Sequence, residues 1–110
     1  LIRASFAHSE IRKAGSLKQY QASVLGTDII RTMESTDKIL KEDFGIRDIS
    51  YKIEAGKTGF TNSAGYCFAS QIKDSQNRRL LVVVLNSSSI YERFNDTKSL
   101  AYWVFNNYLW

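Results

Sequence analysis

The sequence has 110 residues, enough for one domain with a single hydrophobic core but not for two. Hydrophobic residues make up 44% and charged residues 24% of the chain, so its composition is that of a globular protein and excludes intrinsic disorder. The net charge of +4 is a small excess, and no basic run exceeds two residues, which excludes the concentrated positive charge of a nucleic-acid-binding surface.

Cysteine content and hydropathy set two further limits. The single cysteine, Cys67, excludes an intramolecular disulfide. The longest apolar run, residues 80–85, is far shorter than the ~20 residues of a membrane-spanning helix. The chain starts at Leu1 with neither a methionine nor a signal peptide, and we expect it to be a mature fragment or a trimmed product.

The first quarter of the chain predicts two short helices and a strand. Residues 1–8 fit the end of a helix, Ser9 can cap a short helical turn over 10–14, and Gly15 suits the end of that turn. Residues 17–25 alternate loosely between apolar and polar side chains, which predicts a half-exposed strand followed by a turn at 26–28.

The next segment is less decisive until it reaches a strand. Residues 29–40 fit either an extended segment or a helix, and 43–45 predict a connecting loop. Residues 50–55 alternate again, with Tyr51, Ile53 and Ala55 on one face, and this strand runs directly into Lys57-Thr58-Gly59.

The second half of the chain predicts a sheet covered by a helix. Strands are expected at 50–55, 66–73 and 80–86, joined by a break at Gly65 and a polar turn at 74–77. The β-branched run 80–86 is typical of a strand at the centre of a sheet with both faces covered.

A capping box then opens the last element, because Ser89 is followed three residues later by Glu92. Apolar residues recur at helical spacing over about five turns: Ile90, Phe94, Thr97, Ala101, Val104 and Tyr108. We predict the α+β class: a three- or four-stranded antiparallel sheet with a long C-terminal helix packed on it.

The triplet Lys57-Thr58-Gly59 is the strongest candidate for a site. Neighbouring side chains of a strand point to opposite faces, so Lys57 and Thr58 can serve one ligand only if the strand is an edge and the ligand lies along it. Bare positions at Gly56 and Gly59 would let an extended peptide approach and pair by β-addition. Lys57 and Thr58 would then bind a terminal carboxylate, and the Phe60 N–H would polarise a carbonyl as half of an oxyanion hole.

The triplet continues as Lys-Thr-Gly-Phe-Thr-x-x-Ala-Gly-Tyr-Cys over residues 57–67. This stretch resembles the third motif of the penicillin-binding serine enzymes, and most closely that of the low-molecular-weight D-alanyl-D-alanine carboxypeptidases, Lys-Thr-Gly-x-Thr-x-x-Ala-Gly. The likeness covers essentially the whole chain. It includes segments 10–13 and 35–40, the run at 79–85, the helix end at 103–105, and Ser88, Ser89, Arg93, Phe94, Asp96 and Leu100.

The resemblance implies a β-lactamase/transpeptidase-like fold and a serine acyl-enzyme that trims peptidoglycan stem peptides. It implies Lys57, Thr58 and Gly59 as catalytic positions and Lys57, Thr58, Phe60 and Thr61 as substrate-binding positions. The ligands would be a stem peptide ending in D-Ala-D-Ala and β-lactams, with no metal and no cofactor, in the extracytoplasmic cell envelope.

This family also needs a Ser-x-x-Lys motif followed by Ser-x-Asn, both before Lys-Thr-Gly. The sequence contains Ser35-Thr36-Asp37-Lys38 and Ser75-Gln76-Asn77, but the first lies in a segment that the resemblance explains otherwise and the second follows the third motif. We therefore interpret residues 1–110 as the C-terminal part of a penicillin-binding/transpeptidase-like domain without its nucleophile. The isolated chain is expected to be inactive. Residues 80–85 are expected to form an exposed apolar surface that needs a missing N-terminal segment, a second copy or strand exchange.

Two alternatives stay open: a fragment of a β-lactamase-like acyl-serine hydrolase, and a non-catalytic module that binds peptides or exchanges strands. Outside the triplet, structural roles are favoured. We expect Cys67 to be a small buried side chain, His8 a surface or capping residue, and Arg93 a helix-surface salt-bridge partner. Solvated pairs are expected at 12–13 and 78–79, and helix packing for Tyr102, Trp103, Phe105, Tyr108 and Trp110.

Overall fold

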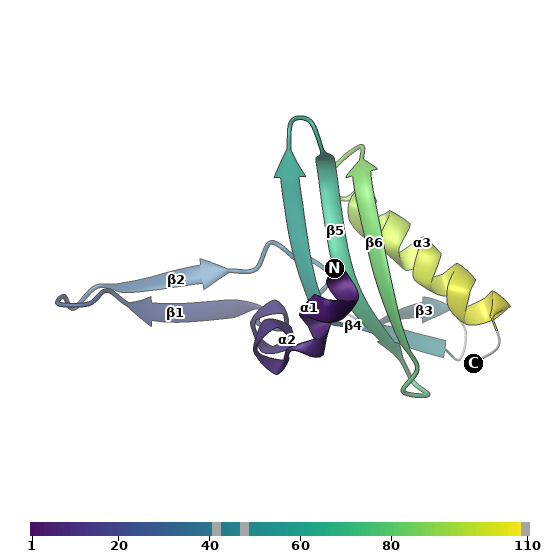
Figure 1. Cartoon of the computed structure of the whole chain (residues 1–110), viewed down its shortest axis with the longest axis horizontal. Coiled ribbons are helices and arrows are strands. Elements are labelled where there is room, and N and C mark those ends of the chain that lie inside the picture. Colours follow the sequence, from purple (N-terminus) through teal and green to yellow (C-terminus); the bar gives the residue numbers. More distant parts are fainter. Residues whose placement is uncertain (41–42, 47–48, 109–110) are drawn as a thin grey trace.

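The described residues form two antiparallel sheets, two short N-terminal helices and a long C-terminal helix (Figure 1), which confirms the α+β class. The computed structural model describes residues 1–40, 43–46 and 49–108. In chain order the elements are α1 (Ile2–Ala7), α2 (Ser9–Gly15), β1 (Gln19–Ser23), β2 (Ile30–Glu34), β3 (Asp43–Ile46), β4 (Ile49–Thr61), β5 (Gly65–Asp74), β6 (Arg79–Ser87) and α3 (Glu92–Asn107).

The main sheet has the strand order β3-β4-β5-β6, and all its pairs are antiparallel. The predicted succession of three strands over 50–86 is confirmed. Gly65 closes the β4–β5 hairpin with φ +64°, and a side chain there would lie 2.6 Å from the Asn86 Oδ1 atom. The position therefore requires glycine both for its left-handed backbone and for space.

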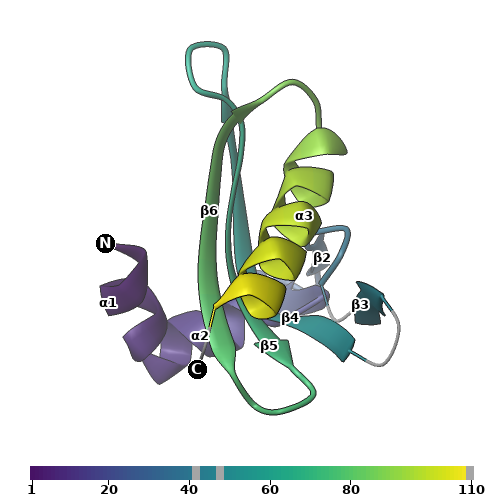
Figure 2. The same cartoon turned by 90° about the vertical axis from the view of Figure 1, so that its right-hand side faces the viewer.

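Helix α3 covers one face of this sheet, while α1 and α2 lie on the opposite side (Figure 2). The core between sheet and helix contains two ring contacts: Tyr51 stacks on Phe105 at 4.9 Å, and Phe68 meets Phe94 edge-on at 5.1 Å. Ile53 and Ile72 are completely buried between them. These aromatic pairs supply much of the apolar area that holds the helix on the sheet.

The predicted helix is confirmed, but its limits and its buried face differ from the prediction. It begins at Glu92, with Tyr91 as the N-cap residue, and the Ser89 hydroxyl accepts a hydrogen bond from the Glu92 N–H at 3.1 Å. Ile90 therefore precedes the helix and is exposed. At the other end Phe105 is buried in place of Tyr108, which follows the last helical residue.

The position predicted for the run 80–86 is wrong. Strand β6 lies at the edge of the sheet, and its side chains alternate: Val82 and Val84 are buried beneath α3, whereas Val83 is 47% and Leu85 71% exposed. Within the described part of the chain, α1 and α2 leave these two side chains uncovered. The expected exposed apolar surface is therefore present on this face of β6.

The loop predicted at 43–45 is also wrong. These residues belong to β3, which pairs with β4 from Asp43↔Lys52 to Ile46↔Ile49. A long neighbouring strand offers unpaired backbone groups, and pairing with them outweighs the weak strand propensity of Asp and Gly. The undecided segment 29–40 is extended at its start, because β2 pairs with β1.

The β1–β2 hairpin projects away from the main sheet (Figure 1). Its turn lies at the predicted Gly26, which has φ +77°. The hairpin carries the apolar cross-strand pair Tyr20↔Met33, and both of these side chains are more than half exposed.

Several smaller expectations are also corrected. Helix α2 takes His8 as its N-cap residue and has no side-chain cap from Ser9. Phe105 packs in the core, but Tyr102, Trp103 and Tyr108 are 41–57% exposed, and Trp110 lies outside the described residues. Across residues 1–40, 43–46 and 49–108, no helix has the length and apolarity to cross a membrane.

Candidate functional site

The triplet Lys57-Thr58-Gly59 lies in β4 where that strand is an edge of the sheet. On one side β4 pairs with β5 along almost its whole length. On the other side β3 reaches only as far as Lys52, and Leu40 adds a single bridge to Ile53. In the described ranges no strand continues along residues 56–61, so β4 meets the geometric condition for binding an extended peptide.

The two polar side chains of the triplet lie on opposite faces of the sheet. Lys57 is exposed, on the face away from α3, and its Nζ atom donates a hydrogen bond to the Thr58 carbonyl. Thr58 is only 8% exposed, and its hydroxyl shares a hydrogen bond with the hydroxyl of Thr36. Both side chains thus have partners within the chain, which a ligand at the edge would have to replace.

The backbone at the edge follows the alternation of an antiparallel ladder, in which every second residue directs its N–H and C=O away from the partner strand. The Thr58 carbonyl accepts a hydrogen bond from the Lys57 Nζ atom, a side-chain contact that fits a residue of the outward-directed set. Phe60, two residues further along, presents its N–H to the same edge. The position expected for half of an oxyanion hole is therefore accessible along β4.

The remaining motif residues shape the end of the strand. The Phe60 ring is 54% exposed and packs against Tyr66 at 4.5 Å, on the same face as α3. The Thr61 hydroxyl accepts a hydrogen bond from the Ala64 N–H at 3.0 Å, so the structure shows Thr61 closing the β4–β5 turn.

The two glycines of the motif differ in their surroundings. A side chain at Gly56 would lie 2.3 Å from the Asp37 Oδ2 atom and 2.8 Å from the Phe68 ring. A side chain at Gly59 would meet only the Cys67 Cβ atom, at 3.8 Å. The space at Gly56 is therefore used by packing within the chain, and only Gly59 leaves room for another backbone.

The segment before β3 runs alongside the triplet. The Ser35 hydroxyl accepts a hydrogen bond from the Asp37 N–H, and the buried Asp37 accepts one from the Ile39 N–H at 3.1 Å. Ser35 is thus engaged in a local turn, while Ser75 lies in the β5–β6 turn, as its sequence position indicated.

A groove with a volume of about 560 Å³ borders the edge at Lys57 and Thr58. Its walls come from α1 and α2, from the base of the β1–β2 hairpin and from the segment that precedes β3. They are largely apolar and include Phe6, Ile11, Leu17, Tyr20 and Met33. These side chains carry no recognisable motif, and sequence reasoning did not connect them with the triplet.

Arg93 is the functional candidate whose surroundings differ most from expectation. It lies in the first turn of α3 and is buried, being only 5% exposed, so the expected helix-surface salt bridge is wrong. Its guanidinium group lies over the rings of Phe94 at 4.9 Å and Tyr66 at 5.7 Å. Its Nη1 atom donates to the Gly59 carbonyl at 3.4 Å.

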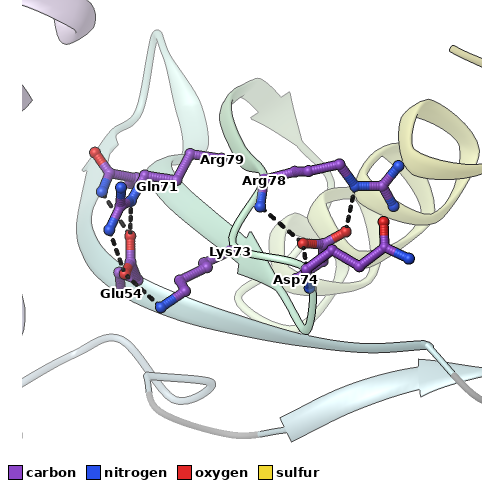
Figure 3. A network of polar contacts seen from close by, with 7 residues as sticks. Glu54, Gln71, Lys73, Asp74, Arg78 and Arg79 are labelled. Atoms are coloured by element: carbon purple, nitrogen blue, oxygen red, sulfur yellow. Dashed lines mark hydrogen bonds and ion pairs between the residues drawn. The ribbon is translucent and has the colours of Figure 1, made fainter. Parts of the chain in front are cut away.

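A polar network holds β4, β5 and β6 together on the face that carries α2 (Figure 3). Glu54 accepts hydrogen bonds from Arg79 at 2.9 Å and from Gln71 at 2.7 Å, and Lys73 lies 4.0 Å away. Burial alone would raise the pKa of Glu54, but these hydrogen bonds and the charges of Arg79 and Lys73 outweigh it and lower the pKa. The carboxylate is thus charged and engaged in holding the strands.

The second carboxylate in Figure 3 belongs to the β5–β6 turn. Asp74 is buried and accepts hydrogen bonds from the Arg78 Nε atom at 2.6 Å and from the Gln76 N–H at 2.9 Å. Arg78 also lies over the Phe105 ring at 5.4 Å. The prediction of a solvated pair at 78–79 is wrong for Arg78, whose side chain is mostly buried beside Asp74, whereas Arg79 is exposed and bridges to Glu54.

The side chains that commonly hold metals are dispersed. His8 is exposed at the start of α2, as expected, and Cys67 is only half-buried, with its Sγ atom 3.3 Å from the Ala64 carbonyl. No group of three or more His, Cys, Asp or Glu side chains gathers within the described residues.

A search of protein-family models finds none that matches the chain, and a search of curated proteins finds no match either.

Proposed function

We propose that this chain supplies the substrate-binding edge of a serine-type D-Ala-D-Ala carboxypeptidase with a β-lactamase/transpeptidase-like fold. One observation carries the proposal: Lys57, Thr58, Gly59 and the Phe60 N–H follow one another along a stretch of β4 with no strand on its outer side in the described residues. The likeness of residues 57–67 to the third motif of the penicillin-binding serine enzymes supports the same assignment.

In this proposal a stem peptide ending in D-Ala-D-Ala lies along the edge of β4. Lys57 exchanges the Thr58 carbonyl for the terminal carboxylate, and Thr58 turns its hydroxyl from Thr36 to the same group. The carbonyl oxygen of the penultimate residue accepts a hydrogen bond from the Phe60 N–H, which stabilises the negative charge that develops there. The absence of a side chain at Gly59 allows the two backbones to approach.

In this proposal the nucleophilic serine comes from a segment that precedes residues 1–110. Its hydroxyl attacks the penultimate carbonyl, and the peptide bond to the terminal D-Ala breaks. The serine proton passes to the leaving amine, and water then hydrolyses the acyl-enzyme. We place this reaction outside the cytoplasmic membrane, at the peptidoglycan, and the β-lactam ring would enter as a substrate analogue.

The test is acylation of the complete protein by a labelled penicillin, followed by intact mass measurement and peptide mapping. The adduct is expected on a serine outside residues 1–110, whereas the isolated chain remains unlabelled. Lys57→Ala should slow acylation by about 10- to 100-fold, the usual worth of a hydrogen bond to a charged group. Lys52→Ala is the matched control, because Lys52 is an exposed lysine of the same strand at a position that β3 pairs.

The outcomes separate the possible activities. A label on Ser35 would show that the nucleophile assignment is wrong. A complete protein that binds D-Ala-D-Ala peptides through β4 but never forms an adduct would instead be a non-catalytic module. Rapid turnover of the penicillin, with release of its hydrolysed product, would favour a β-lactamase.

A further inference from the structure

Arg93 carries a buried charge that lacks the usual compensation. Within 4.0 Å of its guanidinium group the described residues place no carboxylate, and its buried Nε atom has no hydrogen-bond partner. A buried arginine is ordinarily paired with an anion, because removing a charge from water is costly.

The position of Arg93 in its helix is unfavourable as well. It is the second residue of α3, where the partial positive charge of the helix N-terminus repels a cation. The rings of Tyr66 and Phe94 offset part of the cost through cation–π contacts. Burial and helix position both disfavour a cation at residue 93. We therefore look for the reason for Arg93 in the group that its guanidinium contacts in β4.

That contact is the Gly59 carbonyl, which belongs to the same peptide group as the Phe60 N–H. The peptide bond is planar and trans, so its C=O and N–H point in opposite directions. The alternation of the β4–β5 ladder directs this carbonyl toward β5 and the Phe60 N–H toward the open edge of β4, and Arg93 adds a charged donor to the carbonyl from the side of α3. Donation to the carbonyl also draws electron density from the peptide group and makes its N–H a stronger donor.

We infer that Arg93 is the positioning residue of the oxyanion hole: its guanidinium group holds and polarises the Gly59–Phe60 peptide group, whose N–H the sheet directs toward a substrate carbonyl. This inference rests on the proposed function. Arg93 acts behind the peptide group, without touching the substrate, and the role differs from that of Lys57, which binds the terminal carboxylate. Loss of Arg93 should therefore slow acylation while leaving the affinity for the terminal carboxylate nearly unchanged.

The Phe60 amide can be observed directly. Gly-Phe occurs once in the 110 residues, at Gly59-Phe60, so labelling the complete protein with ¹³C-carbonyl glycine and ¹⁵N-phenylalanine gives this chain a single carbonyl-to-amide NMR correlation. Loss of that correlation in Gly59→Ala assigns it. In Arg93→Met the Phe60 proton and the Gly59 carbon should both move upfield, because the carbonyl loses a charged donor.

Acylation by penicillin provides the second readout. Arg93→Met should lower its rate by about tenfold, less than the 10²- to 10³-fold cost of removing an oxyanion donor outright. Arg93→Lys keeps the charge and should recover part of both effects; it is also the variant to measure if Arg93→Met does not fold. Phe94→Leu is the control, because it disturbs the packing beside Arg93 and lowers stability without removing the donor to Gly59.

The outcomes are distinguishable. An unchanged Phe60 correlation in folded Arg93→Met or Arg93→Lys overturns the inference. So does a Phe94→Leu variant whose Phe60 correlation and acylation rate change as much as those of Arg93→Met. A correlation that shifts in a protein that penicillin never acylates leaves Arg93 as the group that polarises this amide and removes the proposed function.

Discussion

Gly56 and Gly59 are three residues apart in one strand, yet a methyl group at each should have opposite effects on stability. In Gly56→Ala the new Cβ atom would lie 2.3 Å from the Asp37 Oδ2 atom and 2.8 and 2.9 Å from two carbons of the Phe68 ring. Asp37 and Phe68 are both buried, and Asp37 also accepts the Ile39 N–H, so neither can move aside freely. The substitution overfills a packed site.

Overpacking of this kind costs about 1–3 kcal/mol, and two blocked neighbours favour the upper half of that range. For a domain of about this size each kcal/mol lowers the melting temperature by roughly 4–8 °C. In Gly59→Ala the nearest atom is 3.8 Å away and the backbone φ is not positive, so the methyl group fits. Reduced freedom of the unfolded chain should then stabilise this variant by about 0.4–1 kcal/mol.

Urea denaturation followed by circular dichroism measures both variants against the wild type. A Gly56→Ala protein as stable as the wild type would refute the packing argument, as would a Gly59→Ala protein that is equally destabilised. Under the proposed function Gly59→Ala has a second consequence: it keeps its stability but loses acylation, because the methyl group obstructs the peptide on the edge.

Three further predictions concern charge and exposed surface. Arg78→Gln should destabilise the fold by about 1–3 kcal/mol in urea denaturation, because it strips the buried Asp74 carboxylate of a charged donor. Arg79→Gln, in an exposed pair with Glu54, should cost at most about 1 kcal/mol, and equal losses would contradict this contrast. The folded-state pKa of Glu54 lies below its unfolded value of about 4.5. Its contribution to the free energy of unfolding is therefore complete above about pH 4.5 and disappears as the pH falls through the folded-state pKa. Glu54→Gln should therefore flatten the acid limb of stability against pH, and an unchanged limb would show that other carboxylates produce it. Leu85→Lys should change stability by no more than about 0.5 kcal/mol while reducing self-association in sedimentation experiments, because Leu85 projects into solvent; a larger loss would mean that β6 is covered in solution.

The strands that carry the motif could be predicted because local signals agree there with the final packing. Alternation around Tyr51, the turn at Gly65 and the polar turn before Arg79 fixed β4, β5 and β6 in order. Helical spacing likewise identified α3 and three residues of its buried face: Phe94, Thr97 and Ala101.

The predictions failed for residues 80–86 and 43–45, where the structure of a segment depends on which strands lie beside it. Whether the run containing Val83 is central or at an edge is decided by the number of neighbouring strands, which β-branched composition cannot count. The strand at Asp43 exists because β4 is long enough to pair with it, against its own propensity.

In the candidate site, too, local sequence patterns predicted some features, while others depend on segments distant in sequence. Alternation along β4 predicted that Lys57 and Thr58 face opposite sides, and the structure shows this. The hydroxyl of Thr36, the tight packing at Gly56 and the burial of Arg93 involve partners 12 to 34 residues away in sequence. Their proximity follows only from the three-dimensional path of the chain.

The projecting β1–β2 hairpin implies that the molecule does not open as a single cooperative unit. Among the described residues its two strands pair only with each other, most of its side chains are exposed, and a two-stranded hairpin is marginally stable in water. Its amide protons should therefore exchange with solvent long before those of β4 and β5, whose exchange requires separation of the core beneath α3. A melting curve of this chain would report the four-stranded sheet, while the hairpin opens and closes many times below the transition.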